Sequence, residues 1–371
     1  MLGVEIDYKK RIFGFDLLRA FAIFCVVRNH ARMSIEDHFI TGFPWVPTPH
    51  GVDIFFVLSG FLLGISFIKH AESKRCVESG KMTSYWKKTV FRILPNYYAI
   101  LVLNYILVSL QVINGNTSHF PVWRFFTFTQ NLFTPFYDFF WESWSLSTQI
   151  WFYLLFPFLF WALCKKIPAK KSVWIISMFF VCISITYRIV ISGKHYDAFW
   201  WDVSFRKVAA SRIDCIFAGV LTAWFKFYCP KLWKKSAWPA FLLGIVIFFL
   251  SVNYKGDYNT FYKNVISLSL PSLYISLGFP LLDSMKKCKT VIGKSISHIS
   301  ILSYSIYLLN MLIASILVKN IPDTINAYPV VSYVLYWFVV FVASIILYRL
   351  IEKPSMNFYE KHLQSKKADA N

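Results

Sequence analysis

Residues 13–34 read FGFDLLRAFAIFCVVRNHARMS, and this apolar stretch decides the fold. A membrane crossing takes about 20 predominantly apolar residues, and the stretch is long enough. Asp16, Arg19 and His30 lie within it; ionisable side chains are costly inside a membrane, so they are candidates for function. On an α-helix, Arg19 and His30 would lie about 20° apart around the axis and about 16 Å apart along it. The stretch therefore predicts a transmembrane helix that carries both side chains on one face, near opposite ends.

A structural interpretation of the same helix stays open at this point. Arg19 would then extend its guanidinium to the inner interface, and His30 would be an interfacial histidine paired with a neighbour. The helix taken alone does not decide between the two interpretations.

Composition places the whole chain in the membrane. The 371 residues are 57% hydrophobic with a mean hydropathy of +0.50, and apolar runs near 20 residues recur along the chain. The first run is long and charged and lacks a small-residue cleavage site, so no cleavable signal peptide is expected. We predict an all-α, polytopic transmembrane helix bundle, with residues 1–371 as one domain and short basic cytoplasmic tails at 1–11 and 352–371.

Ten spans are predicted from the apolar runs. They lie near residues 13–33, 51–69, 93–113, 144–164, 172–192, 207–227, 237–252, 265–283, 296–318 and 330–350. With both termini in the cytoplasm, 27 of the 39 Lys and Arg residues fall at inner ends and loops, as the positive-inside rule requires. The net charge of +20 is therefore a topology signal, and no nucleic-acid partner is expected.

The seven cysteines agree with this topology. They lie within predicted spans or near the inner face, where disulfides do not persist. They show no CxxC spacing, so no metal site is predicted.

The second predicted span begins with GVDIFFVLSGFLLG at Gly51 and carries Asp53 at its outer end, at nearly the depth of His30. A carboxylate beside an imidazole fixes its tautomer and raises its basicity, which a general base needs. The alternative for Asp53 is a capping carboxylate near the start of a helix. In the same span Gly60 is expected to serve close helix packing, and the role of Ser59 is left open.

These two stretches, together with WSLSTQIWFYLLFP from Trp144, resemble the acyltransferase 3 family of integral membrane enzymes. Members of that family transfer acyl groups, usually acetyl, onto glycans and other acceptors, and their hallmark is an arginine followed after ten residues by a histidine. The resemblance runs from Phe15 to Pro354. It includes FRILPNYYA, SRIDCIFAGV, SYSIYLLN and IEKP.

Two positions depart from the family pattern. Gln149 stands where the family usually has glutamate, and Asn310 stands where many members have histidine. An amide orients a substrate but takes no proton at neutral pH, so a mechanism that needs a carboxylate at Gln149 is in doubt.

The resemblance implies roles for particular residues. His30 would be the general base, Asp53 would orient its imidazole, and Arg19 would bind the donor or stabilise developing negative charge. Arg19 and Arg92 would hold the phosphates of coenzyme A, although plain positive-inside charge also explains Arg92. Supporting positions are Asp16, Ser59, Gly60, Trp144, Ser145, Gln149, Tyr153, Arg212, Asp214 and Glu352.

Two regions keep alternative interpretations. Arg212 and Asp214 lie inside one span, and we expect them to form a structural ion pair with each other. The outer loop from Asn114 to Ser143 is rich in aromatic residues. It predicts either an aromatic belt at the membrane interface or a platform over which an acceptor lies.

The resemblance thus predicts a multi-pass protein of the bacterial cytoplasmic (inner) membrane. It would be an acyl-CoA-dependent O-acyltransferase, with acetyl-CoA as the donor and a glycan or lipid-linked saccharide as the acceptor. Direct transfer and an acyl-histidine relay both stay open. The alternative class is a transporter or carrier of a glycan or lipid, because buried charges also mark permeation pathways. The sequence indicates neither the acceptor sugar nor the oligomeric state.

Overall fold

The computed structural model describes residues 11–34, 47–74, 78–119, 121–254, 256–288, 290–320 and 329–368. All regular secondary structure within these ranges is helical, so the predicted all-α bundle is confirmed. The amino-terminal tail at 1–10, the loop at 35–46, Cys76 and the last residues at 369–371 lie outside the described residues.

Every predicted span coincides with a helix. The helices at these positions are α1 (Phe13–Ser34), α2 (Gly51–Lys74), α3 (Ser79–Ser109), α5 (Ser143–Cys164), α6 (Ala169–Ile191), α8 (Ala209–Tyr228), α10 (Ala237–Asn253), α11 (Leu270–Ser284), α12 (Val291–Asn320) and α14 (Pro329–Leu347). Shorter or peripheral helices are α4 (Trp123–Phe126), α7 (Ala198–Trp201), α9 (Pro230–Lys235) and α15 (Lys353–Ala368). Three π-helical segments are η2 (Asp202–Arg206), η3 (Tyr262–Ile266) and η4 (Tyr348–Glu352).

The predicted count of ten crossings is not confirmed. Among the described residues, six helices are long and apolar enough to cross a membrane, or seven if α7–η2 and α8, bent by 56°, form one span. α1 falls short because its 22 residues include Asp16, Arg19 and Arg28. α10 and α11 have 17 and 15 residues, fewer than the about 20 that a straight crossing takes.

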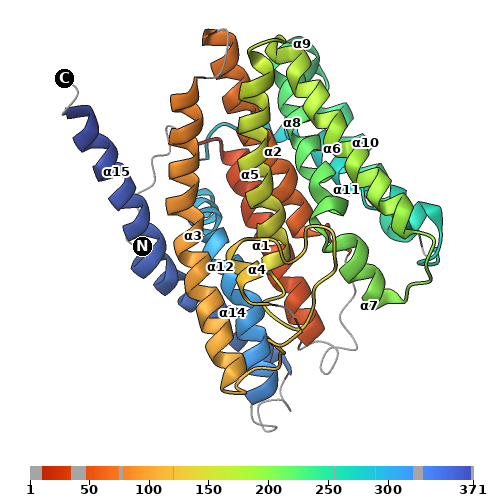
Figure 1. Cartoon of the computed structure of the whole chain (residues 1–371), viewed down its shortest axis with the longest axis vertical. Helices are drawn as coiled ribbons and strands as arrows, with labels where there is room; N and C mark the ends of the chain where they lie inside the picture. The colour runs from red at the N-terminus through yellow and green to blue at the C-terminus, as the bar shows by residue number, and fades with distance from the viewer. Residues whose placement is uncertain are drawn as a thin grey trace.

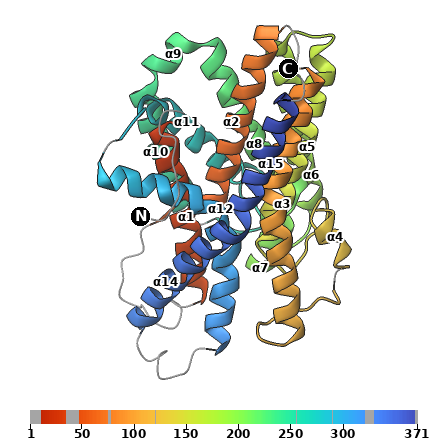
Figure 2. The same cartoon turned by 90° about the vertical axis from the view of Figure 1, so that its left-hand side faces the viewer.

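Figures 1 and 2 show most of the long helices running side by side, roughly along the long axis of the molecule, with α9 near one end, while α14 is strongly tilted in Figure 2. α2 lies against α8, and α1 lies against both α2 and α12. Glycines make the closest of these contacts possible. A Cβ on Gly60 would overlap the carbonyl oxygen of Ile216, and one on Gly219 would overlap that of Val57. The α2 and α8 backbones therefore touch where small residues permit it.

The centre of the bundle is filled by aromatic rings. Phe152, Phe156 and Phe160 stack along one face of α5 at centroid distances of 5.4 and 5.5 Å. Phe217 of α8 meets this row and also stacks on Phe180 of α6 at 4.4 Å.

The aromatic loop between α3 and α5 packs largely inward. Phe125, Phe136, Phe139 and Phe140 are buried, and Phe125 meets the edge of Phe139 at 5.0 Å. Only part of the loop, including Phe133, is exposed as an interface belt would be. Much of this loop therefore belongs to the core.

Candidate active site

Two cavities enter the bundle, and both are lined by Val52 of α2 and Tyr307 of α12. The larger has a volume of about 640 Å³ and lies among α2, α3, α5 and α12. The smaller has a volume of about 370 Å³ and contains His30, His50 and Asp53 in its wall. We call them the inner and the outer cavity, after the predicted topology. The two shared side chains form the boundary between them.

The wall of the inner cavity carries an excess of positive charge. Arg19, Lys81, Lys88 and Arg92 line it, against one acidic residue, Glu360. Within the described part of the chain, the Arg92 guanidinium has no ion pair and no hydrogen bond. It is therefore free to bind an anion.

Arg19 is positioned by Asp16, which is buried near the start of α1. The Asp16 carboxylate lies 3.3 Å from Nη1 of Arg19 and accepts from Nε of Arg11 at 2.9 Å. It also accepts from Ser297 at 3.2 Å and Ser300 at 3.0 Å, both on α12. The Asp16 carboxylate thus joins α1 to α12 and forms ion pairs with two arginines. The cluster therefore keeps a net positive charge.

Ser59, Gln149 and Tyr153 form a polar group on the wall of the inner cavity. The Ser59 hydroxyl oxygen accepts from Nε2 of Gln149 at 2.8 Å and from the Tyr153 hydroxyl at 3.1 Å. A hydroxyl has two acceptor positions and one proton. Both acceptor positions of Ser59 are filled, so its proton is available to a group in the cavity.

At the boundary, α5 and α12 are joined by Ser145 and Tyr307. The Tyr307 hydroxyl donates to the carbonyl oxygen of Glu142 at 2.9 Å and lies 2.6 Å from the Ser145 hydroxyl. Both side chains are buried. The boundary between the cavities is thus a fixed hydrogen-bonded contact.

His30 lines the outer cavity and is held by Asn310 of α12. Nδ1 of His30 is hydrogen-bonded to Oδ1 of Asn310. The Asn310 amide nitrogen donates to the carbonyl oxygens of Ile306 at 3.0 Å and Tyr307 at 2.6 Å, which fixes the amide with its oxygen toward the imidazole. Nδ1 must therefore carry the proton, and Nε2 keeps the lone pair that a base needs.

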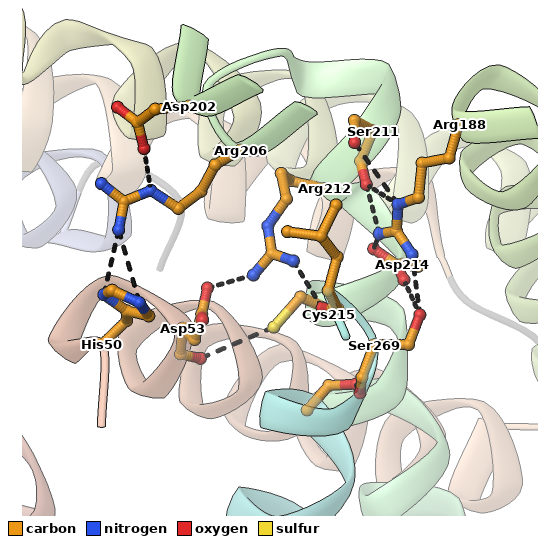
Figure 3. Close-up of polar contacts among 12 residues, drawn as sticks. His50, Asp53, Arg188, Asp202, Arg206, Ser211, Arg212, Asp214, Cys215 and Ser269 are labelled. Atoms are coloured by element: carbon orange, nitrogen blue, oxygen red, sulfur yellow. Dashed lines mark hydrogen bonds and ion pairs between the residues drawn. The ribbon is translucent and has the colours of Figure 1, made fainter. Parts of the chain in front are cut away.

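The predicted contact between Asp53 and the His30 imidazole does not match this arrangement. Asp53 lines the same cavity, but its carboxylate is ion-paired with Nη2 of Arg212 on α8. Figure 3 shows this ion pair between Asp53 and Arg212. Arg212 also donates to the carbonyl oxygen of Leu268. The carboxylate is neutralised by a buried guanidinium, so the partner that orients His30 in this structure is Asn310.

The predicted ion pair between Arg212 and Asp214 is wrong. Asp214 pairs instead with Arg188 of α6 at 2.7 Å and accepts from Ser269 at 2.9 Å (Figure 3). Residues two apart on a helix point about 200° apart, so each side chain meets a different neighbouring helix. The two buried pairs tie α8 to α2 on one side and to α6 on the other.

The second histidine of the outer cavity is already engaged. Nη1 of Arg206 donates to Nδ1 of His50 at 3.0 Å (Figure 3), and Nε of Arg206 lies 2.5 Å from Asp202. Asp202 also pairs with Lys207 at 2.8 Å. The lone pair of Nδ1 of His50 is therefore used by Arg206.

Aromatic side chains form another part of the outer wall. Trp141, Trp144 and Phe199 line it, and Trp141 meets Phe199 edge to face at 6.2 Å. The Lys207 ammonium lies 4.4 Å from the centre of the Trp141 ring. Trp141, from the aromatic loop, thus faces the cavity, as the platform interpretation of that loop expects.

Glu352 lies apart from both cavities. Its buried carboxylate accepts from Ser305 of α12 at 2.7 Å and from Asn96 of α3 at 3.0 Å. These contacts join η4 to α12 and α3, so the role of Glu352 is to hold these helices together.

Sequence reasoning missed several residues that the structure brings to the outer cavity. Among those that line it are Glu142, Phe199, Asp202, Arg206 and Lys207, none of which belongs to a motif. A signal was present for one of them, because Glu142 is an acidic residue that interrupts an aromatic run two positions before Trp144.

Comparison with known proteins gives one match. The family model described as an acyltransferase domain covers residues 12–350, nearly the whole chain. No curated protein and no solved structure matches significantly.

Proposed function

The chain belongs to this family of membrane acyltransferases, and from that premise we propose the reaction that it catalyses. It transfers an acyl group, which we take to be acetyl, from cytoplasmic acyl-CoA to a hydroxyl group at the outer side of the membrane. That hydroxyl group belongs to a glycan or a lipid-linked saccharide. One observation carries the proposal. A cavity lined by cations and a cavity lined by a histidine with a free lone pair meet at Val52 and Tyr307. Such a pair of cavities suits a donor and an acceptor that enter from opposite sides.

The inner cavity suits an acyl-CoA. Its volume of about 640 Å³ lies in the usual range for small-molecule sites, and coenzyme A carries several phosphate charges. Arg92, Lys81 and Lys88 would contact those phosphates, since charge-assisted contacts to phosphate are strong. The pantetheine arm would then pass Ser59 toward Tyr307, which brings the thioester to the boundary of the cavities.

His30 would perform the proton transfer. The acceptor hydroxyl gives its proton to Nε2 of His30 as its oxygen attacks the thioester carbonyl carbon. Asn310 holds the imidazole in the required tautomer by accepting from Nδ1. The tetrahedral intermediate collapses by breaking the carbon–sulfur bond, and the CoA thiolate leaves through the inner cavity, taking a proton from His30 or from solvent.

The proposed setting is the cytoplasmic membrane of a bacterium. The donor would arrive from the cytoplasm and the acceptor from the opposite face. The charge bias of the loops supports this sidedness, because the predicted inner ends hold most of the basic residues.

The experiment has two parts. Mass spectrometry of the surface glycan, with and without the gene, should show an acetyl-sized mass difference in cells that carry it. Purified protein in nanodiscs should release free CoA thiol from acetyl-CoA only when membranes or glycan from the gene-deleted strain are added. Movement of a saccharide without consumption of thioester would instead identify a carrier.

A further inference from the structure

Glu142 is a buried carboxyl group in the outer cavity to which the mechanism above gives no task. Its side chain lines the cavity together with His30 and Trp144, and the residue is only 4% exposed. It stands immediately before α5, and its carbonyl oxygen is held by Tyr307. Its backbone is therefore fixed beside the candidate base.

Structural contacts account for only part of the Glu142 carboxyl group, which accepts a hydrogen bond from its own backbone N–H. It is the residue that precedes the first turn of α5, but its side chain makes no capping hydrogen bond. Oε1 is buried and has no hydrogen-bond partner among the described residues. The nearby cations Arg206 and Lys207 are both paired with Asp202. An unpaired buried polar atom costs free energy and calls for an explanation.

The surroundings of Glu142 match the chemistry of a sugar. Trp141 and Phe199 offer apolar ring surfaces beside the carboxyl group, and a saccharide ring presents apolar C–H faces with hydroxyl groups around its edge. A carboxyl group bonds such hydroxyl groups well, because it both donates and accepts when protonated.

We propose that Glu142 binds the acceptor: its protonated carboxyl group donates a hydrogen bond to a saccharide oxygen next to the hydroxyl that His30 deprotonates, while the sugar ring lies against Trp141 and Phe199. The inference rests on the proposed function, and it assigns to Glu142 the selection of the acceptor saccharide.

The protonation state follows from burial. Burial raises the pKa of Glu142 to about 8, so the carboxyl group is protonated below that pH and ionised above it. The charged and titratable groups around Glu142 are His30 on α1, His50 and Asp53 at the start of α2, Tyr97 on α3, Asp202, Arg206 and Lys207 at η2, Tyr307 on α12 and Tyr336 on α14. Hydrogen-bond donation by Glu142 is consequently lost as the pH rises through about 8.

The test uses membranes from a gene-deleted source strain that expresses each variant, because such membranes contain the native acceptor. Incorporation of radiolabelled acetyl-CoA is measured from pH 6 to pH 9.5. Glu142→Ala should lower incorporation at saturating donor at least tenfold, with the KM for acetyl-CoA unchanged. Glu142→Gln keeps a donor at the same place, so it should retain a substantial fraction of the rate at pH 7. It should also lose the decline that the unmodified protein shows above about pH 8.

Asp138→Asn is the matched control, because Asp138 is an acidic residue of the same loop, 40% exposed, and pairs with His119 away from the cavity. It should leave rate and pH profile unchanged. If the unmodified protein incorporates label but Glu142→Ala does so equally well, or if Glu142→Gln keeps the alkaline decline, the inference is wrong. If the unmodified protein incorporates no label, the proposed function itself fails.

Discussion

At the scale of single residues, the reactivity of His30 depends on the amide that holds it. The Asn310 side-chain amide makes three hydrogen bonds, two to carbonyl oxygens of its own helix and one to the imidazole. An amide held in this way presents only its oxygen to His30. The free Nε2 of His30 is therefore a consequence of how α12 packs against α1.

The first prediction concerns this contact. Asn310→Ala removes the acceptor for Nδ1, so the imidazole loses its fixed tautomer and orientation. Transfer should fall by about 10-fold or more, and by no more than the factor of about 10² to 10⁴ that a positioned base contributes. Donor binding should be unchanged, because Asn310 does not line the inner cavity. Thiol release and calorimetry on the same preparation measure the two quantities, and unchanged transfer would show that another group holds His30.

The second prediction concerns Gln149, which donates to Ser59. A carboxylate at this position only accepts hydrogen bonds, so Gln149→Glu would draw the Ser59 proton away from the cavity. Transfer should drop but stay measurable, and Gln149→Ala should be worse because Ser59 loses a partner altogether. Initial rates of thiol release decide the order. A large increase in turnover for Gln149→Glu would show that a carboxylate has a chemical task there.

At this scale the sequence predicted functional roles for Arg19, His30 and Arg92, because charges in or beside apolar runs stand out, and the structure places all three in the cavity walls. The sequence did not identify their partners. Arg212 and Asp214 were expected to pair because opposite charges inside a membrane usually do, but residues two apart on a helix point in nearly opposite directions. Asn310 was noticed only as a departure, since its contact with His30 spans 280 positions along the chain.

At the scale of helices, the bundle depends on places where two backbones meet. Gly60 and Gly219 form one such place between α2 and α8, the helices that carry Asp53 and Arg212. Any side chain there forces the helices apart and separates this buried ion pair. Breaking a buried pair is expensive because it leaves an uncompensated charge.

The third prediction is that Gly60→Ala lowers the thermal denaturation midpoint of the purified protein by several degrees. Overpacking of this kind typically costs about 1 to 3 kcal/mol. Gly80→Ala is the matched control, because nothing lies within 4 Å of a Cβ at Gly80. A midpoint for Gly60→Ala equal to that of the control would mean that α2 and α8 do not touch there.

Helix positions were predictable because apolar runs of about 20 residues are typical of membrane-spanning helices. The number of crossings was not, since length and charge put α1, α10 and α11 below what a straight span takes. The inward packing of the aromatic loop was also missed. Aromatic residues suit both a membrane interface and a core, and composition does not distinguish the two.

At the scale of the whole molecule, the fourth prediction concerns sidedness. Reporter fusions after Lys171, Ser236 and Asn371 should score cytoplasmic, and fusions within 114–143 and 256–264 should score external. The fusion within 256–264 is the most informative, because it tests whether the two short helices α10 and α11 cross the membrane. A cytoplasmic score there would reduce the crossings by two, and a reversal at Lys171 would overturn the assignment of inner and outer cavities.

The central claim is that donor binding and proton transfer belong to different cavities. His30→Ala and Arg92→Ala separate them, with His298→Ala and Arg349→Ala as controls, because neither control residue lines the inner or the outer cavity. Acetyl-CoA binding by calorimetry and transfer by thiol release are measured on the same preparations.

The account predicts that His30→Ala binds acetyl-CoA normally and loses transfer by a factor of roughly 100 or more. It predicts that Arg92→Ala weakens binding by roughly 1.5 to 3 kcal/mol, the worth of a charge-assisted contact. Full transfer activity in His30→Ala would contradict it.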